Sequence, residues 1–477
     1  MSLSQRPLPG CVLVAALLLA APVHAQMSND PFDVPLASNG EVIQVDYEDF
    51  AEIPDVGGEP SRMMQLQDEP VVGRMFLNGM RGPVHTVGYD GAVALYLDIN
   101  ASEWGVRVES SGRERGVQSF ALHPQFAEAG TPGYGKLYAW TDTENTAPAP
   151  DFVSGGGDDA HDTVLLEWTA TDASGARYDG GPPRELMRFE QPFGNHNGGQ
   201  IGFNPLASPG DADFGLLYIG VADGGSGGDP LDLSQNLSSG FGKIFRIDPL
   251  GSDSENGEYG IPADNPYARD GDPDTLGEIY AYGVRNPQRF AWDPENGNLF
   301  LADVGQNIVE ELSLVTRGGN LGWNDWEGSF RFISRQAVDL ASPRSDPGVN
   351  YPVAEYGQLD PLFQPQSAAS GVHVYRGAEI PQLADLVLFT DLPSGEILHI
   401  DADDLPDGGQ ALIGRVLLNE GDEASTVLDV VRAKNLEQGR DPATRVDLHL
   451  ARGPGEQVFL LNKHDGVLRR LVPDADP

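Results

Sequence analysis

Four stretches of the chain share one alternation of apolar and polar positions. In each, a short apolar run ends in a turn rich in proline or glycine, and a second apolar run follows: 120–142, 201–220, 290–303 and 448–461. Two such runs joined by a tight turn are typical of a β-hairpin. The first three hairpins begin about 80 to 90 residues apart, and the gap before the fourth is roughly twice as long, which indicates a repeat with one divergent unit.

Apolar runs at 372–375, 386–390 and 396–400 supply the divergent unit, and 76–110 can supply a first one. All-β units that repeat at a fixed period predict a β-propeller. The expected fold is therefore all-β, a six-bladed β-propeller with long inter-strand loops that spans residues 76–477. Helical periodicity is almost absent, and a segment near the C-terminus, 417–439, is the one that departs from the strand pattern.

The first 25 residues are typical of an export signal. Arg6 precedes an apolar run at 12–21, and the small residues around His24 predict cleavage after Ala25. The apolar run is too short to span a membrane. We therefore expect a periplasmic or secreted protein with a cleavable signal peptide over 1–25.

Residues 26–75 are acidic, rich in proline and aspartate and weakly patterned, which predicts an extended N-terminal arm. Cys11 is the only cysteine and would leave with the signal peptide, so we expect no disulfide and no thiolate ligand. Because Cys11 stands before the apolar run and not after it, a lipoprotein site is disfavoured.

The chain is strongly acidic, with 72 Asp and Glu against 30 Lys and Arg and a formal charge of −42. This charge disfavours binding to nucleic acid and to anionic membranes. It is typical of a solvated acidic surface, and attraction of calcium or of cationic partners is the functional alternative. Beyond the signal peptide, we expect no membrane span.

His196 lies in a turn with Asn195, Asn197, Gly198 and Gly199, directly before a predicted strand. A single histidine is often structural. In a turn at the end of a propeller strand, however, it can point into the central channel and act as a general base near neutral pH.

Other polar residues stand where strands are predicted to end. Arg285 and Asn286 precede Pro287, and a guanidinium there can bind an oxyanion or cap a turn. Asp223 lies with Asp229 in a glycine-rich loop. Carboxylates and carbonyls in such loops suit calcium, but Asx turns have the same composition, so both interpretations stay open.

Taken together in chain order, these motifs resemble the soluble glucose/sorbosone dehydrogenase family of six-bladed propellers. That family includes aldose sugar dehydrogenases that use pyrroloquinoline quinone (PQQ) and proteins similar to the Hedgehog-interacting protein. The resemblance is carried by the segments 112–116, 120–124, 195–199, 218–230, 235–248, 282–287, 302–307, 318–323 and 374–377.

The resemblance implies an enzyme that oxidises the C1 hydroxyl of an aldose to a lactone. His196 would be the catalytic base that takes the proton from the anomeric hydroxyl, and Asp223 an acidic residue of the same site. Arg285 would contact the quinone and support its reduced form. Because the chain has no haem-attachment motif, electrons would pass to an external acceptor.

The resemblance also implies which residues hold the cofactor and calcium. Those expected at the quinone are Glu114, Asn195, Arg285, Asn286 and Arg445. The main-chain carbonyls of Gly305 and Gln306 would hold the calcium bound with the quinone, and Glu311 with the carbonyl of Leu321 a second, structural calcium.

The sequence departs from the quinone-binding pattern at three places. Glu114 stands where these enzymes commonly have a glutamine, Pro393 where a lysine is expected, and Arg445 alone where an Arg-x-Arg pair is expected. Losing cations that would pair with the carboxylates of PQQ predicts weaker binding. In these substitutions the sequence is most similar to the Hedgehog-interacting-like branch of the family.

Two other functions therefore stay open. The first is a non-catalytic propeller that binds a carbohydrate or a protein through its loops. The second is a calcium-dependent hydrolase or lactonase that uses Glu114, Asp223 and His196 around a metal. The resemblance also allows an oligomer formed through blade edges.

Overall fold

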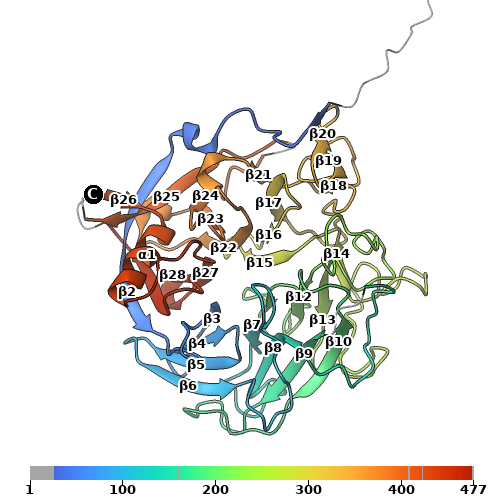
Figure 1. Cartoon of the computed structure of the whole chain (residues 1–477). Helices are drawn as coiled ribbons and strands as arrows, with labels where there is room; N and C mark the ends of the chain where they lie inside the picture. The colour runs from blue at the N-terminus through green and yellow to red at the C-terminus, as the bar shows by residue number, and fades with distance from the viewer. Residues whose placement is uncertain (1–25, 158–160, 407–408, 422, 475–477) are drawn as a thin grey trace, which may run out of the picture.

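Antiparallel sheets make up most of the computed structural model, which describes residues 26–157, 161–406, 409–421 and 423–474. The sheets are grouped around a common centre and follow one another round it largely in chain order (Figure 1). The signal peptide expected over 1–25 lies outside the described residues.

In the described part of the chain, four sheets around the centre have four strands each. The first consists of β3 (Met63–Glu69), β4 (Arg74–Gly79), β5 (Pro83–Gly88) and β6 (Val93–Asp98). The second consists of β7 (Val117–Leu122), β8 (Lys136–Thr143), β9 (Asp162–Thr169) and β10 (Arg184–Glu190). The third consists of β11 (Ile201–Phe203), β12 (Leu217–Val221), β13 (Lys243–Ile247) and β14 (Ile279–Tyr282). The fourth consists of β15 (Pro287–Trp292), β16 (Leu299–Asp303), β17 (Val309–Leu314) and β21 (Ala354–Gly357).

A nine-stranded sheet completes the circle. Its order is β22 (Ala369–Tyr375), β23 (Leu386–Asp391), β24 (Ile397–Asp401), β25 (Gly414–Glu420), β2 (Val42–Glu52), β29 (Val467–Val472), β28 (Val458–Leu461) and β27 (His449–Arg452), with β26 (Glu423–Ser425) paired to β25. One α-helix, α1 (Val427–Glu437), follows β26 and begins in a capping box made by Thr426 and Asp429.

A small sheet lies at the periphery, with β1 (Met27–Ser28), β20 (Ala337–Asp339), β19 (Phe330–Ser334) and β18 (Trp326–Glu327). Where the structure describes the chain, four short 3₁₀ turns connect strands: η1 (Leu36–Asn39), η2 (Pro361–Phe363), η3 (Pro381–Leu383) and η4 (Pro454–Glu456). Among the described residues, no helix is both long and apolar enough to cross a bilayer.

The predicted hairpins are confirmed. The pairs β7–β8, β11–β12, β15–β16 and β27–β28 are all antiparallel neighbours. The divergent unit forms β22, β23 and β24, which also pair antiparallel. The segment that departs from the strand pattern contains α1.

The N-terminal arm expected over 26–75 is part of the sheets, and the boundary expected at 76 falls inside β4. Within that range, β2 pairs parallel with β25 and antiparallel with β29, so it joins the two halves of the nine-stranded sheet. In β2, Val45 and Ala51 are the buried residues. A strand with so few buried positions has little of the alternation by which a sequence reveals a strand.

The innermost strands form a closed ring around the centre. Contacts run from β3 to β7 and from β7 to β11, from the β11–β12 pair to β15, and on through β22 and β27 back to β3. Each of these strands is the first of its unit along the chain. Their starting ends therefore meet at one end of the ring, and their finishing ends at the other.

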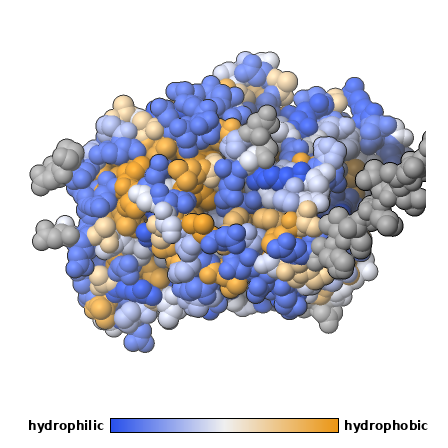
Figure 2. Space-filling view, turned by 90° about the horizontal axis from the view of Figure 1, so that it is seen from above, coloured by the Kyte–Doolittle hydropathy of each residue, from blue (hydrophilic) through white to orange (hydrophobic). Residues whose placement is uncertain are grey.

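The hydrophobic core lies between neighbouring sheets and not in the centre. One cluster packs the sheet of Trp140 and Phe189 against that of Phe245, and another packs Phe76 against Phe120 and Trp168. Seen at right angles to Figure 1, the surface is largely polar with apolar residues exposed between the polar ones (Figure 2). Burial between sheets holds the ring together and leaves the loops at its two ends available for function.

Candidate active site

The predicted site residues gather at the end of the ring where the innermost strands start. Glu114 precedes β7, His196 precedes β11, and Arg285 precedes β15. Asp223 follows β12, which runs antiparallel to β11, so it returns to the same end. The sheets thus bring together residues that are far apart in the sequence.

His196 and Asp223 form a buried hydrogen-bonded pair. Nδ1 of His196 lies 2.6 Å from Oδ1 of Asp223, and the two residues are 5% and 2% exposed. An ionised carboxylate can only accept, so Nδ1 carries the proton and Nε2 is left as the basic nitrogen. Nε1 of Trp323 donates to the other carboxylate oxygen at 2.9 Å, which fixes Asp223 at both oxygens.

Asp223 stays ionised in spite of its burial. Burial alone would raise its pKa, but the charge and hydrogen bond of His196, together with the charge of Arg285, outweigh burial and lower the pKa. The permanent negative charge of Asp223, beside Nδ1, stabilises the imidazolium that forms when Nε2 takes a proton.

The turn around His196 has an unusual backbone. His196 has a φ of 58°, in the left-handed region that residues with a side chain rarely adopt, and its amide donates to Oε2 of Glu114 at 2.8 Å. A Cβ at Gly199 would lie 1.6 Å from the carbonyl oxygen of Pro287, so glycine is required where the turn packs on β15. The neighbours therefore hold a strained backbone, a feature that is concentrated at functional sites.

Arg285 lies against the same pair. Its carbonyl accepts from the amide of Asp223 at 2.8 Å, and its guanidinium carbon is 5.6 Å from the centre of the Trp323 ring. Nη1 donates to the carbonyl of Val304 at 2.8 Å, whereas Nε is buried with no hydrogen-bond partner among the described residues. A buried donor without an acceptor is a group that a ligand oxygen can satisfy.

Asp303 and Trp323 belong to the site, although the sequence indicated Asp303 only as a residue of a loop suited to calcium and gave no role to Trp323. Asp303 accepts from the amide of Arg285 at 2.8 Å and from that of Asn286 at 2.6 Å, which fixes the backbone before β15. Both residues stand in segments that carry the family resemblance, 302–307 and 318–323. Their position in those segments was a signal, but the sequence does not show which side chain faces Asp223.

The two aspartates of the glycine-rich loop have different roles. Asp223 faces His196, whereas Asp229 accepts from the amides of Leu233 and Ser234 at 3.0 and 2.8 Å and so closes a turn. Asn195 steadies the same loop, since its Oδ1 accepts from the amide of Ser226 at 2.9 Å.

The loop of Gly305 and Gln306 lies next to Arg285. The amide of Gly305 donates to Glu310 at 3.2 Å, and its carbonyl is 3.5 Å from Nε2 of Gln358, a weak hydrogen bond that leaves this oxygen able to bind a cation. Oε1 of Gln306 accepts from the amide of Gly228 at 2.6 Å, which ties this loop to the glycine-rich loop of Asp223.

Glu311 is buried on β17, the strand that pairs with β16 and follows the loop of Gly305 and Gln306. Its Oε1 accepts from the amide of Gly328 at 2.6 Å. Burial raises its pKa well above the usual range, and the nearby charges of Asp303 and Glu355 raise it further. The amide of Leu321 donates to the carbonyl of Tyr282 at 2.8 Å.

In the described residues no group of three or more His, Cys, Asp or Glu side chains is arranged to hold a metal ion.

Arg445 contacts neither His196 nor Asp223 through a hydrogen bond or ion pair in the described residues. It pairs with Asp447, which stands at the second position of the expected Arg-x-Arg, and donates to Oε1 of Gln366 at 2.9 Å. The carbonyl of Pro393 accepts from the amide of Val446 at 3.1 Å. Asp447 therefore neutralises the one arginine that the sequence offers here.

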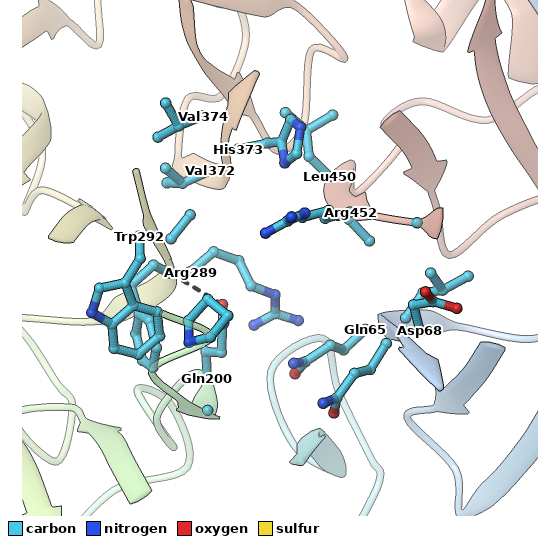
Figure 3. Close-up of a pocket in the computed structure, with 18 of the residues that line it drawn as sticks. Gln65, Asp68, Gln200, Arg289, Trp292, Val372, His373, Val374, Leu450 and Arg452 are labelled. Carbon is cyan, nitrogen blue, oxygen red and sulfur yellow. Dashed lines mark hydrogen bonds between the residues drawn. The ribbon is translucent and has the colours of Figure 1, made fainter. Parts of the chain in front are cut away.

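The opposite end of the ring holds a cavity of about 430 Å³ (Figure 3). Arg289 points into it and is 3% exposed, and its guanidinium donates to the carbonyls of Met64 and Gln118 at 2.8 and 3.3 Å. Burial lowers the pKa of Arg289 to about 9. Most of its lining comes from the later residues of β3, β11, β15, β22 and β27, whereas His196 precedes β11.

Known proteins resemble this chain in sequence and in fold. The sequence profile of the family described as Glucose / Sorbosone dehydrogenase matches residues 60–416, most of the chain. The HIPL1 protein of Arabidopsis thaliana is 33% identical over 318 residues, which cover 58% of this chain and 43% of that protein. The aldose sugar dehydrogenase YliI of Escherichia coli is 26% identical over 235 residues, 46% of this chain and 52% of that protein. The chain thus spans about half the length of these curated relatives.

Solved structures show the same fold. The PQQ-bound form of an aldose sugar dehydrogenase from Streptomyces coelicolor matches with a TM-score of 0.56 and 20% identity, covering 89% of this chain and 97% of that one. The apo-form of the soluble aldose sugar dehydrogenase from Escherichia coli matches with a TM-score of 0.59 and 18% identity, covering 90% of this chain and all of the other. The likeness supports the expected all-β propeller.

Proposed function

The chain belongs to the glucose/sorbosone dehydrogenase family, and on that premise we propose that it is a PQQ- and calcium-dependent sugar dehydrogenase. It oxidises the C1 hydroxyl of an aldose to a lactone and passes the electrons to an external acceptor. The observation that carries the proposal is the buried His196–Asp223 pair, 2.6 Å apart, with Arg285 against it.

His196 acts as the general base of this reaction. Oxidation at C1 removes a hydride from carbon and a proton from the hydroxyl, and Nε2 takes the proton while Nδ1 stays bonded to Asp223. Asp223 holds the imidazole in the required tautomer and stabilises its charged form. Bound PQQ would supply the two-electron acceptor for the hydride.

The residues near Arg285 suit a quinone. Arg285 offers a buried Nε without a partner in the described residues, which suits a carbonyl that gains negative charge on reduction. Asp303 holds the backbone amides of Arg285 and Asn286, and the carbonyl of Val304 accepts from the guanidinium of Arg285, so the cation is oriented before the ligand arrives. Glu114 and Asn195 complete the proposed cofactor site.

Calcium suits the oxygen donors beside this site. The carbonyls of Gly305 and Gln306 would hold the ion bound with the quinone, and Glu311 with the carbonyl of Leu321 a second ion. Hard oxygen ligands are those that calcium prefers, and a cation would relieve the cost of burying Glu311 near other carboxylates.

We extend the proposal to the architecture and the cellular location. If β22–β25 count as one blade, and β27–β29 with β2 as another, the circle of sheets has six blades. The pattern of residues 1–25 supports export to the periplasm or beyond. Edge strands such as β6 leave room for an oligomer formed through blade edges.

A titration tests the function. Purified protein loaded with calcium is titrated with PQQ while the quinone absorbance is followed, and a panel of aldoses is then added with a dye acceptor. The proposal expects saturable binding and sugar-dependent dye reduction that His196→Ala abolishes. No binding at roughly tens of micromolar PQQ, a weak affinity for a cofactor, would contradict it.

A second function is favoured by one observation. Pro393 and Asp447 stand where cations would pair with the carboxylates of the quinone, and Asp447 neutralises Arg445. A propeller that binds a carbohydrate or a protein without redox chemistry would tolerate these changes. In that case glycans would bind the protein while PQQ would not.

A further inference from the structure

A second cavity, of about 550 Å³, opens at the same end of the ring as the His196–Asp223 pair. Its walls come from the segments before β3, β7 and β27 and from the turns after β4 and β28. By the strand directions, all of these lie where the innermost strands start. The basic side chains that line it are Arg62, Arg81, Arg113, Arg440, Arg445 and Lys463.

The charge of this cavity is opposite to that of the chain. Six Arg and Lys side chains line it against three carboxylates, Glu59, Asp441 and Asp447, in a protein with a formal charge of −42. A fifth of all the Lys and Arg of the chain therefore surrounds one cavity. Two of the six cations are already paired, Arg440 with Asp55 and Arg445 with Asp447. An acidic surface with solvated charges does not require such a cluster, so the cluster calls for a specific explanation.

Three of the arginines have contacts that leave their charge unneutralised. Arg62 donates to the carbonyl of Arg113 at 2.9 Å, Arg81 to the carbonyl of Pro60 at 3.0 Å, and Arg113 to the amide oxygen of Gln366 at 3.4 Å. Neutral oxygens satisfy hydrogen-bond donors but do not cancel charge. These guanidinium groups therefore remain available to pair with an anion.

The cations also repel one another. Burial lowers the pKa of Arg62, and the charge of Arg81 lowers it further. Burial lowers the pKa of Lys463 to about 7; Asp447 opposes this effect, and Arg62 adds to it. Asp447, itself paired with Arg445, is the buried carboxylate that offsets them. Like charges packed around a cavity favour the entry of a negative group.

We propose that this cavity is a binding site for a small organic carboxylate. Arginine forks match carboxylate geometry, and a volume of this size holds a ligand of several hundred daltons. The wall is continuous with the catalytic end, because Arg113 precedes Glu114, whose carboxylate accepts from the amide of His196. The cavity thus supplies cations from positions other than those of Pro393 and Asp447.

Two molecules share this chemistry, and naming them rests on the proposed function. One is PQQ, which carries several carboxylates, and the other is an acidic sugar of the uronate type. In the first case the cavity replaces the missing cofactor cations; in the second it selects the substrate. Either ligand would be attracted locally in spite of the net charge of the protein.

Calorimetric binding to the full mature chain, with calcium present, tests the proposal without turnover. The probes are PQQ, glucuronate, glucose and inorganic phosphate. The first variant is the double substitution of Arg62→Gln and Arg81→Gln. Because Arg62 also supports the loop of Arg113, its loss could disturb that loop, and the second variant is therefore the single surface substitution Arg113→Gln. Arg107→Gln is the control, since Arg107 is an exposed arginine paired with Glu144. Melting curves check that each variant folds.

The proposal expects PQQ or glucuronate to bind more tightly than glucose, with affinity about tenfold lower or more in both cavity variants and unchanged in the control. Loss for PQQ alone identifies the cofactor, and loss for glucuronate alone identifies the substrate. Binding equal in all variants, or seen for no carboxylate, overturns the proposal, as does tight binding of phosphate alone. A protein that binds the carboxylate but reduces no dye would contradict the proposed function and leave this inference standing.

Discussion

At the scale of single residues, the site depends on how side chains are oriented rather than on which are present. The turns at the ends of predicted strands indicated His196 and Arg285, and the family resemblance indicated Asp223. The sequence did not predict that Trp323 bonds to Asp223 at 2.9 Å or that Asp303 holds the backbone of Arg285. Such contacts join distant segments, and local patterns carry no information about them.

The pairing of His196 with Asp223 predicts the effect of Asp223→Asn. An amide at that position can donate to Nδ1, which favours the wrong tautomer and leaves Nε2 protonated. We expect kcat to fall by roughly 10²–10⁴-fold while PQQ affinity changes little. Steady-state kinetics and a quinone titration measure the two quantities separately.

Asp229→Asn is the matched control for that variant. Asp229 lies in the same loop but caps a turn through the amides of Leu233 and Ser234. We expect it to lower the melting temperature with little effect on kcat. An equal loss of kcat in both variants would show that the loop, and not the His196–Asp223 pair, sets the rate.

The lowered pKa of Lys463 predicts how the affinity for a carboxylate depends on pH. Its pKa is lowered to about 7 by burial and by Arg62, Arg289 and Arg445, with Asp447 opposing them. Between pH 7 and its ordinary value of about 10.5, the unfolded chain holds the proton that the folded protein has lost, so this lysine makes stability rise with pH in that window. A bound anion favours the charged form.

Affinity for the carboxylate should therefore fall as pH rises through about 7, by at most about tenfold per pH unit for a single proton. Binding curves measured between pH 6 and 9 show this slope. Lys463→Met, which keeps the volume of the side chain and removes its charge, should flatten the slope. The same slope in both proteins would exclude Lys463 as its source.

At the scale of elements, the hairpins could be predicted from the sequence, but the strand that joins the two halves of the nine-stranded sheet could not. The apolar runs and turns identified β7–β8, β11–β12, β15–β16 and β27–β28, since each pair is local in sequence. The strand β2 was missed because it buries few residues and pairs with strands from the far end of the chain. The peripheral strands β18 to β20 and β1 were missed for a different reason, because with two to five residues each they are too short to show a pattern.

The role of β2 in joining the nine-stranded sheet predicts that its buried positions matter for stability. Val45 is fully buried in β2, whereas Val42, three residues away on the same strand, is 44% exposed. We expect Val45→Ala to cost about 2 kcal/mol of unfolding free energy and Val42→Ala less than about 0.5 kcal/mol. Denaturant unfolding measures both, and equal costs would show that β2 does not close the sheet.

At the scale of the whole molecule, the charged residues are separated into clusters of opposite sign, although the chain as a whole is strongly acidic. The surface is acidic, yet buried carboxylates collect near Glu311 and cations collect at the cavity of Arg62 and Lys463. The formal charge of −42 was readable from composition, but the separation of the two clusters was not. Both lie at or beside the end of the ring where the innermost strands start.

The buried carboxylates predict that calcium stabilises the protein. Burial and neighbouring charges penalise ionised Glu311, and a bound cation removes that penalty. Calcium at about 100 times its dissociation constant should add about 2.7 kcal/mol and raise the melting temperature, and a chelator should reverse the gain. Glu311→Gln should lose most of the effect. A melting temperature that does not respond to calcium would contradict a structural calcium site.

The most direct test of the proposed function is a single turnover. The protein is loaded with calcium and PQQ, an aldose is added without a dye acceptor, and the absorbance of the oxidised quinone is followed in the protein and in His196→Gln. The account predicts that the aldose reduces the quinone in the protein, that a sugar lacking the C1 hydroxyl does not, and that His196→Gln binds PQQ but leaves it oxidised. Quinone that is bound yet never reduced by any aldose would contradict the account and identify the fold as a binding propeller.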